Sequence, residues 1–296
     1  MRVHLIDASP YIFRAYFSLP PSLKDRQGRP VNAVHGFASF LLRLRELESP
    51  SHLALFFDRS LNSSFRNELL PSYKAQRELP PPELEAQLDT CERLGQALGI
   101  AVFASERFEA DDLLAAVCRA RVAEGHEVCL VSSDKDLMQL VSERVTLYDF
   151  ARDERYDPAG VRAKFGVDPA QIADYLGLAG DSVDNIPGVP GIGPKTAAAL
   201  LQELGSLDGI YARLAEVPNL KMRGAAAVAA KLAQHRESAF LSRELALLPL
   251  AAAEEAQVEL AGLALREPLA ELATLLDELG FTQLRAKLEA WGPVKE

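Results

Sequence analysis

Cysteine is scarce in this sequence, and what there is forms no familiar pattern. Among 296 residues there are three cysteines, Cys91, Cys118 and Cys129. The odd number and the lack of a Cys-x-x-Cys pair exclude a disulfide scaffold and give no zinc-binding spacing. The five histidines are scattered along the chain, so a histidine-based metal site is not indicated either. The sequence therefore predicts buried, free thiols in a reducing compartment.

Long hydrophobic runs are also missing. The longest nearly apolar stretch, residues 245–253, is interrupted by Pro249 and is far shorter than the roughly 20 residues that span a bilayer. The first residues lack the apolar core of a signal peptide. We therefore expect a cytoplasmic protein with no membrane contact.

Basic charge is not in excess. The chain has 32 basic and 42 acidic residues, a net charge of −10, which excludes a strongly basic protein that wraps nucleic acid. Hydrophobic residues (48%) and charged residues (25%) are present in the proportions of an ordinary globular protein. Where the carboxylates lie matters more than how many there are.

The first half of the chain alternates strand-like and helix-like segments. Short apolar runs occupy residues 3–8, 52–57, 101–103, 127–133 and 145–150, and helical patterns occupy 33–48, 83–98 and 110–124. This alternation predicts an α/β domain over residues 1–158, with a mostly parallel central sheet flanked by helices. Alanine- and leucine-rich helical patterns then predict a second, helical lobe over residues 159–296.

Aspartates end three of the predicted strands: Asp7, Asp58 and Asp134. A single aspartate after a strand is commonly a helix cap, but ligands of α/β sheets bind beyond the carboxyl ends of the strands, where these three would meet. Six more acids lie near helix starts or turns, namely Glu109, Asp111, Asp112, Asp136, Asp181 and Asp184. Such crowding is costly without cations, and ligands that are all carboxylates favour Mg²⁺ or Mn²⁺ over zinc.

A basic stretch over residues 59–77 follows the second strand. Lys74 and Arg77 would share one helix face and could grip a phosphate, with Tyr73 or Phe65 stacking on a base. A solvated surface helix explains the same charges, so both interpretations stay open.

A glycine- and proline-rich turn over residues 188–196 leads into another predicted helix. It superficially resembles a P-loop, but Pro194 separates the last glycine from Lys195, and no strand precedes the turn. A helix-hairpin-helix over about residues 170–204 fits better, because its glycines let the backbone approach a DNA phosphate at a helix N-terminus.

Taken in order, these motifs resemble the bacterial 5′→3′ exonuclease and flap endonuclease family. The resemblance rests on Ile6-Asp7 with Arg14, Phe56-Phe57-Asp58, Phe65-Arg66, Tyr73-Lys74-Ala75 with Arg77, Glu109-Ala110-Asp111-Asp112, Ser133-Asp134-Lys135-Asp136 and the segment 180–196. It implies a PIN-like 5′ nuclease fold with a helical arch at about residues 62–90. It also implies a structure-specific 5′→3′ exonuclease and flap endonuclease that hydrolyses DNA by a two-metal-ion mechanism. We expect no polymerase domain in this chain.

The resemblance also assigns roles to residues. It implies a first metal cluster of Asp7, Asp58, Glu109 and Asp111, and a second of Asp134, Asp136 and Asp181 bridged by Asp111, with Asp112 and Asp184 acting through water. Tyr73, Lys74 and Arg77 match the arch, Arg14 and Arg66 match phosphate-contacting positions, and Gly188, Gly191, Gly193, Lys195 and Thr196 match the duplex-binding hairpin.

The same resemblance implies cofactors and partners. It implies two or more Mg²⁺ ions, with Mn²⁺ as a substitute, and a K⁺ ion at the hairpin. It implies a nucleoid-associated monomer that acts on DNA with free 5′ ends or 5′ flaps beside a DNA polymerase and a ligase. Since nine of the 42 acids fall in the metal-site set, the remaining acids nearly equal the 32 bases. The acidic balance therefore need not exclude DNA.

Three rival functions remain to be tested. A non-catalytic DNA-binding scaffold would use only the hairpin, and a related nuclease would act on RNA. A phosphatase with an aspartate nucleophile is the third, although Ser9 occupies the second position of its usual Asp-x-Asp motif.

Overall fold

A six-stranded sheet forms the centre of the molecule, which we describe from a computed structural model for residues 1–59 and 64–291. The strand order is β3-β2-β1-β4-β5-β6, and every neighbouring pair is parallel except the antiparallel edge pair β5 and β6. The strands are β1 Arg2–Asp7, β2 His52–Asp58, β3 Ala101–Ser105, β4 Glu127–Val131, β5 Val145–Asp149 and β6 Glu154–Tyr156. Strand order reverses between β1 and β4, the point where α/β sheets bind their ligands.

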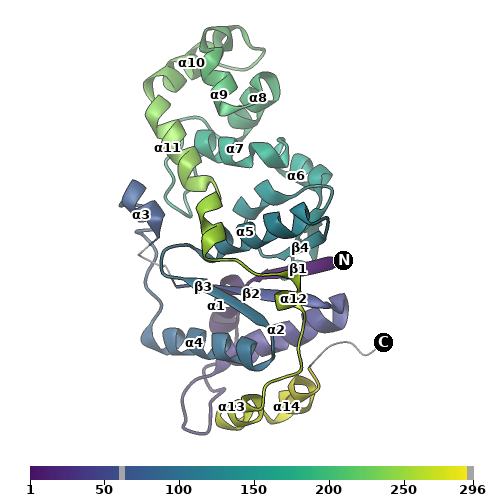
Figure 1. Ribbon diagram of the computed structural model, residues 1–296. Coiled ribbons are helices and arrows are strands. Elements are labelled where there is room, and N and C mark those ends of the chain that lie inside the picture. The colour runs from purple at the N-terminus through teal and green to yellow at the C-terminus, as the bar shows by residue number, and fades with distance from the viewer. Residues whose placement is uncertain (60–63, 292–296) are drawn as a thin grey trace.

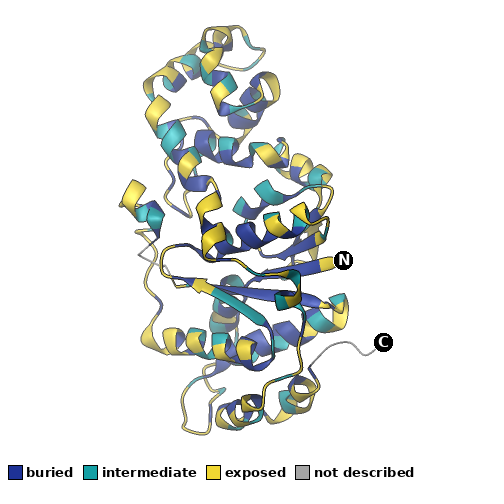
Figure 2. Ribbon diagram, in the orientation of Figure 1, coloured by how far each residue is buried: buried dark blue, intermediate teal, exposed yellow. Residues whose placement is uncertain are grey.

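The sheet is buried on both faces, which explains its nearly continuous apolar strands. Leu5 packs with the α5 side of the core, whereas Ile6 packs with the α1, α2 and α4 side. Figures 1 and 2 show the buried strands between these two helical layers. The helices are α1 Ser9–Ser18, α2 Asn32–Glu48, α4 Pro82–Ala97 and α5 Ala110–Ala123.

A helical lobe stands above α5 in Figure 1 and shares a continuous apolar core with it. Its helices are α6 Pro158–Phe165, α7 Ile172–Ala179, α8 Pro194–Leu204, α9 Leu207–Ala212, α10 Ala225–Gln234 and α11 Arg236–Ala246. Residues 180–193 join α7 to α8, where a helix-hairpin-helix was expected. Short 3-10 helices occupy Asp136–Leu140, Pro169–Gln171, Leu214–Asn219 and Leu250–Glu254.

The last segment departs from the expected division of the chain. Instead of staying in the helical lobe, residues 260–291 run back along the α/β domain (Figure 1). Leu265 N–H donates to the carbonyl of Ser51, and Trp291 is buried in the core on the α2 side. The expectation of one helical DNA-binding lobe over 159–296 is therefore wrong for this segment, because its apolar faces complete the α/β core. Its helices are α12 Leu260–Leu263, α13 Glu271–Leu279 and α14 Thr282–Glu289.

The expected helical arch is also corrected, as far as the described residues reach. Residues 62 and 63 lie outside them, and α3 covers only Phe65–Leu69. Residues 70–81 form turns and irregular chain, since Pro71 interrupts the helix and Lys74 has a left-handed φ of 53°. Lys74 and Arg77 therefore do not share a helix face.

Other strands and helices match the sequence-based expectation within a few residues. The helix α1 and the three-residue strand β6 were not expected. In the described part of the chain, no helix combines the length and apolarity needed to cross a membrane.

Candidate active site

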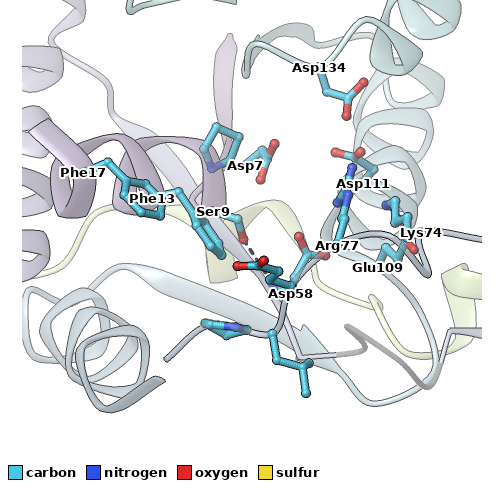
Figure 3. A pocket seen from close by; sticks show the side chains of 14 residues that line it. Asp7, Ser9, Phe13, Phe17, Asp58, Lys74, Arg77, Glu109, Asp111 and Asp134 are labelled. Atoms are coloured by element: carbon cyan, nitrogen blue, oxygen red, sulfur yellow. Dashed lines mark hydrogen bonds and ion pairs between the residues drawn. The ribbon is translucent and has the colours of Figure 1, made fainter. Parts of the chain in front are cut away.

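Carboxylates from separate elements meet at the carboxyl edge of the sheet. Asp7 ends β1, Asp58 ends β2, Asp134 follows β4, and Asp111 lies in the first turn of α5. All four line one cavity of about 460 Å³, and Figure 3 shows them around a common space. The topology predicted this convergence, because the ends of neighbouring parallel strands lie side by side.

Local hydrogen bonds hold these carboxylates in place. The Ser132 hydroxyl donates to Asp7 Oδ2 at 2.8 Å, and Ala110 N–H donates to Asp58 Oδ1 at 2.8 Å. The backbone N–H of Asp136 donates to Asp134 Oδ1, also at 2.8 Å. Each bond uses one carboxylate oxygen and leaves the other to face the cavity or its neighbours.

The cluster is electrostatically strained. Burial, together with the charges of Asp134, Asp7 and Asp58, raises the pKa of Asp111 well above its usual value. Burial and the charge of Asp58 do the same for the pKa of Asp7. Asp111 Oδ1 is buried without a hydrogen-bond partner in the described structure. Oxygen-only donors of this kind fit hard divalent cations, which would relieve the repulsion.

A second group of acids lies beside the first. One carboxylate oxygen from each of Asp136, Asp181 and Asp184 lies within 4.8 Å of the other two. Burial and the nearby Asp134 and Asp184 raise the pKa of Asp136 well above its usual value, and its Oδ1 is also buried without a partner. Lys135 Nζ lies 2.6 Å from Asp181 Oδ2 and offsets part of the negative charge. This group also fits a divalent cation.

The basic residues of the segment 70–81 reach into the same site. Lys74 Nζ donates to Glu109 Oε2 at 2.7 Å, and Arg77 Nη2 donates to Asp184 Oδ1 at 2.5 Å. Burial raises the pKa of Glu109, but Lys74, Arg66 and the hydrogen bonds outweigh it, so the pKa ends below the usual value. Lys74 and Arg77 also line the cavity. Lys74 is half-buried and Arg77 is exposed, so both lie at the mouth of the site, and their contact with a phosphate stays a prediction.

Arg66 and Asp112 have a different role from the expected one. They form a bidentate ion pair with distances of 2.7 and 2.8 Å, and their side chains are 3% and 0% exposed. Asp112 Oδ2 also accepts the Glu109 N–H, as part of the capping box that starts α5. Arg66 is too buried to contact a DNA phosphate, and Asp112 has no oxygen free for a cation. Both residues instead position Glu109 and α5.

Tyr73 differs from expectation, whereas the expected DNA contacts of Phe65 and Arg14 stay predictions. Tyr73 is 4% exposed, and its hydroxyl donates to Glu109 Oε2 at 3.3 Å, so it is not placed to stack on a base. Phe65 is half-buried and packs on Phe108 with 5.9 Å between ring centroids. Arg14 is exposed on α1 and is not among the residues that line the cavity.

Sequence reasoning missed several residues around the cavity. Ser9 lines it, and its hydroxyl accepts the Asp58 N–H at 3.4 Å. Phe13, Phe17 and Leu79 form an apolar wall at the cavity, and Phe17 is 76% exposed. The sequence offered two signals for these residues. Ser9, Phe13 and Phe17 lie two to ten residues after Asp7, and Leu79 directly precedes the prolines at 80–82.

The hairpin presents its backbone to solvent at the start of α8. Gly188 has a φ of 62°, and a Cβ there would lie 2.3 Å from the backbone nitrogen of Gly180, so two turns pack closely at this point. Gly191, Gly193 and Lys195 are exposed, and Thr196 is half-buried. Pro194 occupies the first turn of α8, where its missing N–H costs nothing.

The raised carboxylate pKa values predict a pH-dependent stabilisation by Mg²⁺. A carboxyl whose folded pKa lies above its unfolded value near 3.8 stabilises the fold below that value and loses this contribution as pH rises through the folded pKa. We expect Mg²⁺ to raise the melting temperature clearly at about pH 8 and only slightly at about pH 5, where protons compete. Thermal unfolding with Mg²⁺ and with chelator measures this. Equal shifts at both pH values would contradict the shared-cation interpretation.

The fold and the site together define a class: proteins of the 5′ nuclease type, with a carboxylate-lined sheet edge beside a helix-hairpin-helix. Residues 2–166 match the family model described as 5′-3′ exonuclease, N-terminal resolvase-like domain. Residues 167–271 match the model described as 5′-3′ exonuclease, C-terminal SAM fold. The chain belongs to the 5′-3′ exonuclease family.

Relatives of known sequence agree with this assignment. The chain is 42% identical over 279 residues to DNA polymerase I of Pseudomonas aeruginosa, covering 94% of this chain and 30% of that protein. It is 38% identical over 208 residues to a 5′-3′ exonuclease of Aquifex aeolicus, covering 70% of this chain and 71% of that protein. The chain thus spans about a third of the length of its DNA polymerase I relatives.

Solved structures share the fold. A zinc-bound T5 5′-exonuclease matches with a TM-score of 0.68 at 22% identity, covering 94% of this chain and all of that one. The catalytic core of Rad2 in complex with a DNA substrate matches with a TM-score of 0.64 at 14% identity, covering 98% of this chain and 91% of that one.

Proposed function

We propose that this chain is a structure-specific 5′→3′ exonuclease and flap endonuclease that hydrolyses DNA phosphodiester bonds at or near 5′ ends. The observation that carries the proposal is one cavity in which buried Asp7 of β1 and half-buried Asp58 of β2 and Asp111 of α5 meet Asp134, Lys74 and Arg77. Membership of the 5′-3′ exonuclease family supports it. The proposal includes recognition of DNA structure rather than of base sequence.

Two divalent cations fit the carboxylates. Asp7, Asp58, Asp111 and Asp134 would hold the first, and Asp136, Asp181 and Asp184 the second, with Mg²⁺ as the natural ion and Mn²⁺ as a substitute. When bound, such ions supply Lewis-acid stabilisation of the attacking and leaving oxygens of an in-line displacement. Glu109 acts beside them by holding Lys74, to which it is already hydrogen-bonded.

Lys74 and Arg77 bind the substrate phosphate in this proposal. Glu109 holds Lys74 and Asp184 holds Arg77, so these two basic side chains are already directed at the cavity. Arg77 is largely exposed, so its guanidinium could turn from Asp184 to a phosphate oxygen when that carboxylate holds a metal ion. There the two side chains stabilise negative charge as it develops.

The helix-hairpin-helix binds the duplex next to the site. Exposed Gly191 and Gly193 let the backbone approach a phosphate, to which the backbone N–H of Lys195 and the side chains of Lys195 and Thr196 would donate hydrogen bonds. Carbonyl groups of the same turn would hold a K⁺ ion. The duplex partner is DNA with a free 5′ end or flap.

Replacing Lys195 with Ala is expected to weaken duplex binding equally for all sequences. Loss of one phosphate contact lowers the slope of log affinity against log salt by about one unit. Fluorescence anisotropy over a salt series measures the slope, with Lys287→Ala on α14 as a control that removes the same charge outside the hairpin. A loss that depends on the DNA sequence would argue against phosphate contact.

The relatives support a proposed biological setting. Similarity to part of DNA polymerase I supports a role beside a DNA polymerase and a ligase in repair, and we place the chain in the cytoplasm and at the nucleoid. The three buried free cysteines are consistent with a reducing compartment. We propose that the chain works as a monomer.

Matched DNA and RNA flaps on the same duplex test the substrate class. We expect the DNA flap to be cut near its junction, and a single strand of the same sequence to be cut much more slowly. Faster cleavage of the RNA flap would favour the RNA nuclease, and binding without cleavage of either flap would favour the scaffold.

A further inference from the structure

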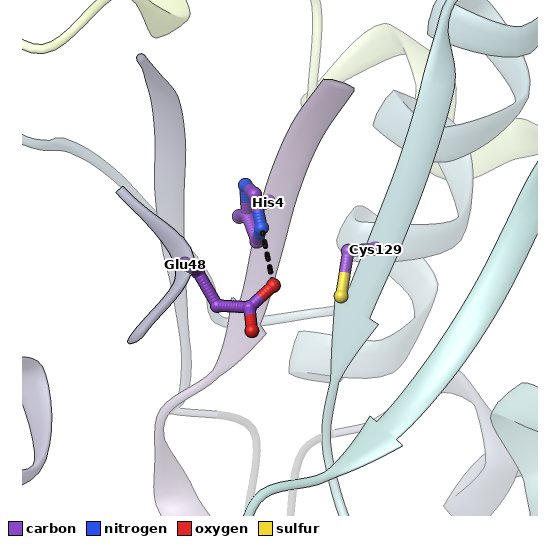
Figure 4. A group of neighbouring side chains, drawn as sticks. All are labelled: His4, Glu48 and Cys129. Atoms are coloured by element: carbon purple, nitrogen blue, oxygen red, sulfur yellow. Dashed lines mark hydrogen bonds and ion pairs between the residues drawn. The ribbon is translucent and has the colours of Figure 1, made fainter. Parts of the chain in front are cut away.

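A second group of potential metal ligands lies inside the α/β domain, away from the carboxylate edge. His4 on β1, Cys129 on β4 and Glu48 at the end of α2 each offer a ligand atom, and these atoms lie within 4.8 Å of one another. Figure 4 shows the three side chains facing one another. None of the three lines the cavity of the candidate active site.

The backbone places these residues together. His4 and Cys129 are direct register partners on the neighbouring parallel strands β1 and β4, so their side chains leave the same face of the sheet. That face is covered by α2, whose last residue is Glu48. Glu48 and Cys129 lie 44 and 125 positions after His4 in the chain, which explains why the sequence shows no zinc-binding spacing.

The separation between His4 and Glu48 is compatible with a tetrahedral metal as well as with a long hydrogen bond. His4 Nε2 and Glu48 Oε2 are 3.4 Å apart, which is long for a hydrogen bond between nitrogen and oxygen. Ligand bonds of about 2.0–2.1 Å in a tetrahedron place neighbouring ligand atoms about 3.4 Å apart. Imidazole, thiolate and carboxylate together are a ligand set that zinc accepts.

Arg155 on β6 holds the Glu48 carboxylate from the side away from His4. Its Nη2 donates to Glu48 Oε1 at 2.5 Å, and its guanidinium lies 3.7 Å from the centre of the Tyr148 ring. This contact fixes one carboxylate oxygen and leaves Oε2 to face His4, as outer partners of metal ligands do. A zinc ion would balance the charges of Glu48 and a Cys129 thiolate.

The group is buried but has a route to solvent. The side chains of His4 and Glu48 are 3% and 11% exposed, and Cys129 is 1% exposed. Glu48, Arg155 and Tyr148 line a surface cavity of about 380 Å³ through which an ion could arrive. Among the described residues, the Nδ1 atom of His4 is buried without a hydrogen-bond partner, so no second bond there fixes which ring nitrogen carries the proton.

We propose that His4, Glu48 and Cys129 form a zinc site with three protein ligands that ties β1, β4 and the end of α2 together. Binding replaces the Cys129 S–H bond with a Zn–S bond and releases one proton to solvent. The fourth position is left for water. Because β1 continues three residues further to Asp7, the site would stiffen the strand that carries a catalytic-edge carboxylate without taking part in the chemistry.

Cobalt substitution tests the site directly, because only a thiolate ligand gives a near-ultraviolet charge-transfer band with Co²⁺. The whole chain is stripped with chelator, saturated with Mg²⁺ to fill the carboxylate edge, and titrated with Co²⁺. We expect a band that saturates at one cobalt per chain and disappears when Zn²⁺, which binds more tightly, is added.

Two cysteine variants locate the band. Cys129→Ser should abolish it and lower zinc affinity more than the roughly 10- to 100-fold that loss of an outer partner costs, as in Arg155→Leu. Cys118→Ser is the matched control, since Cys118 is equally buried but belongs to the core on the other face of the sheet. His4→Gln should weaken zinc binding while leaving Cys129 in place.

The outcomes separate the alternatives. No thiolate band in wild-type protein that circular dichroism shows to be folded would mean that the group is only a buried hydrogen-bonded cluster, and the proposal would be wrong. A band that survives in Cys129→Ser would also overturn it. Neither result bears on DNA cleavage, so the proposed nuclease function stands or falls separately.

Discussion

Replacing both Asp134 and Asp136 with Ala should reduce DNA cleavage by at least about a thousandfold. The double variant removes one carboxylate from each of the two groups at the sheet edge. Stabilisation of the reacting oxygens by bound cations is worth several kcal/mol, and each 1.36 kcal/mol changes the rate about tenfold. Single-turnover cleavage of a flap substrate measures the loss.

DNA binding by the same variant should be preserved or tighter. Burial and the charge of Asp184 raise the pKa of Asp134, and burial and the charge of Asp134 raise the pKa of Asp136. A DNA phosphate next to these carboxylates therefore meets a site that is already crowded with negative charge. Anisotropy in the presence of chelator tests this expectation. Glu83→Ala with Asp89→Ala is the matched control, since it removes two exposed acids from α4. Unchanged turnover in Asp134→Ala with Asp136→Ala would contradict the assignment of the metal site.

Replacing Asp112 with Ala should destabilise the protein by about 3–5 kcal/mol. The change leaves the Arg66 guanidinium buried without its bidentate partner, and removing one partner of a buried ion pair costs this much. It also removes the side chain that accepts the Glu109 N–H at the start of α5. Urea unfolding monitored by circular dichroism measures the loss.

A paired variant separates this structural role from metal binding. Arg66→Met with Asp112→Leu replaces the whole ion pair with apolar side chains and should recover most of the lost stability, because no charge is left buried alone. If Asp112 were a metal ligand, Asp112→Ala would instead lower the affinity for Mg²⁺ and leave the stability nearly unchanged.

The sequence predicted the sheet and its acidic edge well because their signals are local. The predicted runs 52–57 and 145–150 become β2 and β5, since buried parallel strands are short and almost wholly apolar. Asp7 and Asp58 meet because the ends of neighbouring parallel strands are adjacent. The strand β6 has three residues and the helix α1 follows directly on Asp7, so neither gave a pattern long enough to detect.

What the sequence could not predict depends on contacts between distant residues. Arg66 and Asp112 are 46 residues apart, so nothing local shows that each neutralises the other in the interior. Lys74 was expected on a helix, yet the prolines around it and its left-handed φ place it in a turn that reaches Glu109. The return of residues 260–291 to the α/β domain likewise depends on apolar faces that fit only after the core has formed.

The central claim is that the carboxylate edge performs metal-dependent hydrolysis of DNA at 5′ ends. The most direct test is a Mg²⁺ titration of the cleavage of a 5′-labelled flap duplex, with product lengths read out and a chelator control. The account predicts cleavage that rises with Mg²⁺, short products that end at or near the flap junction, and no products with chelator. Equal cleavage with Mg²⁺ and with chelator, or no cleavage at any Mg²⁺ concentration, would contradict it.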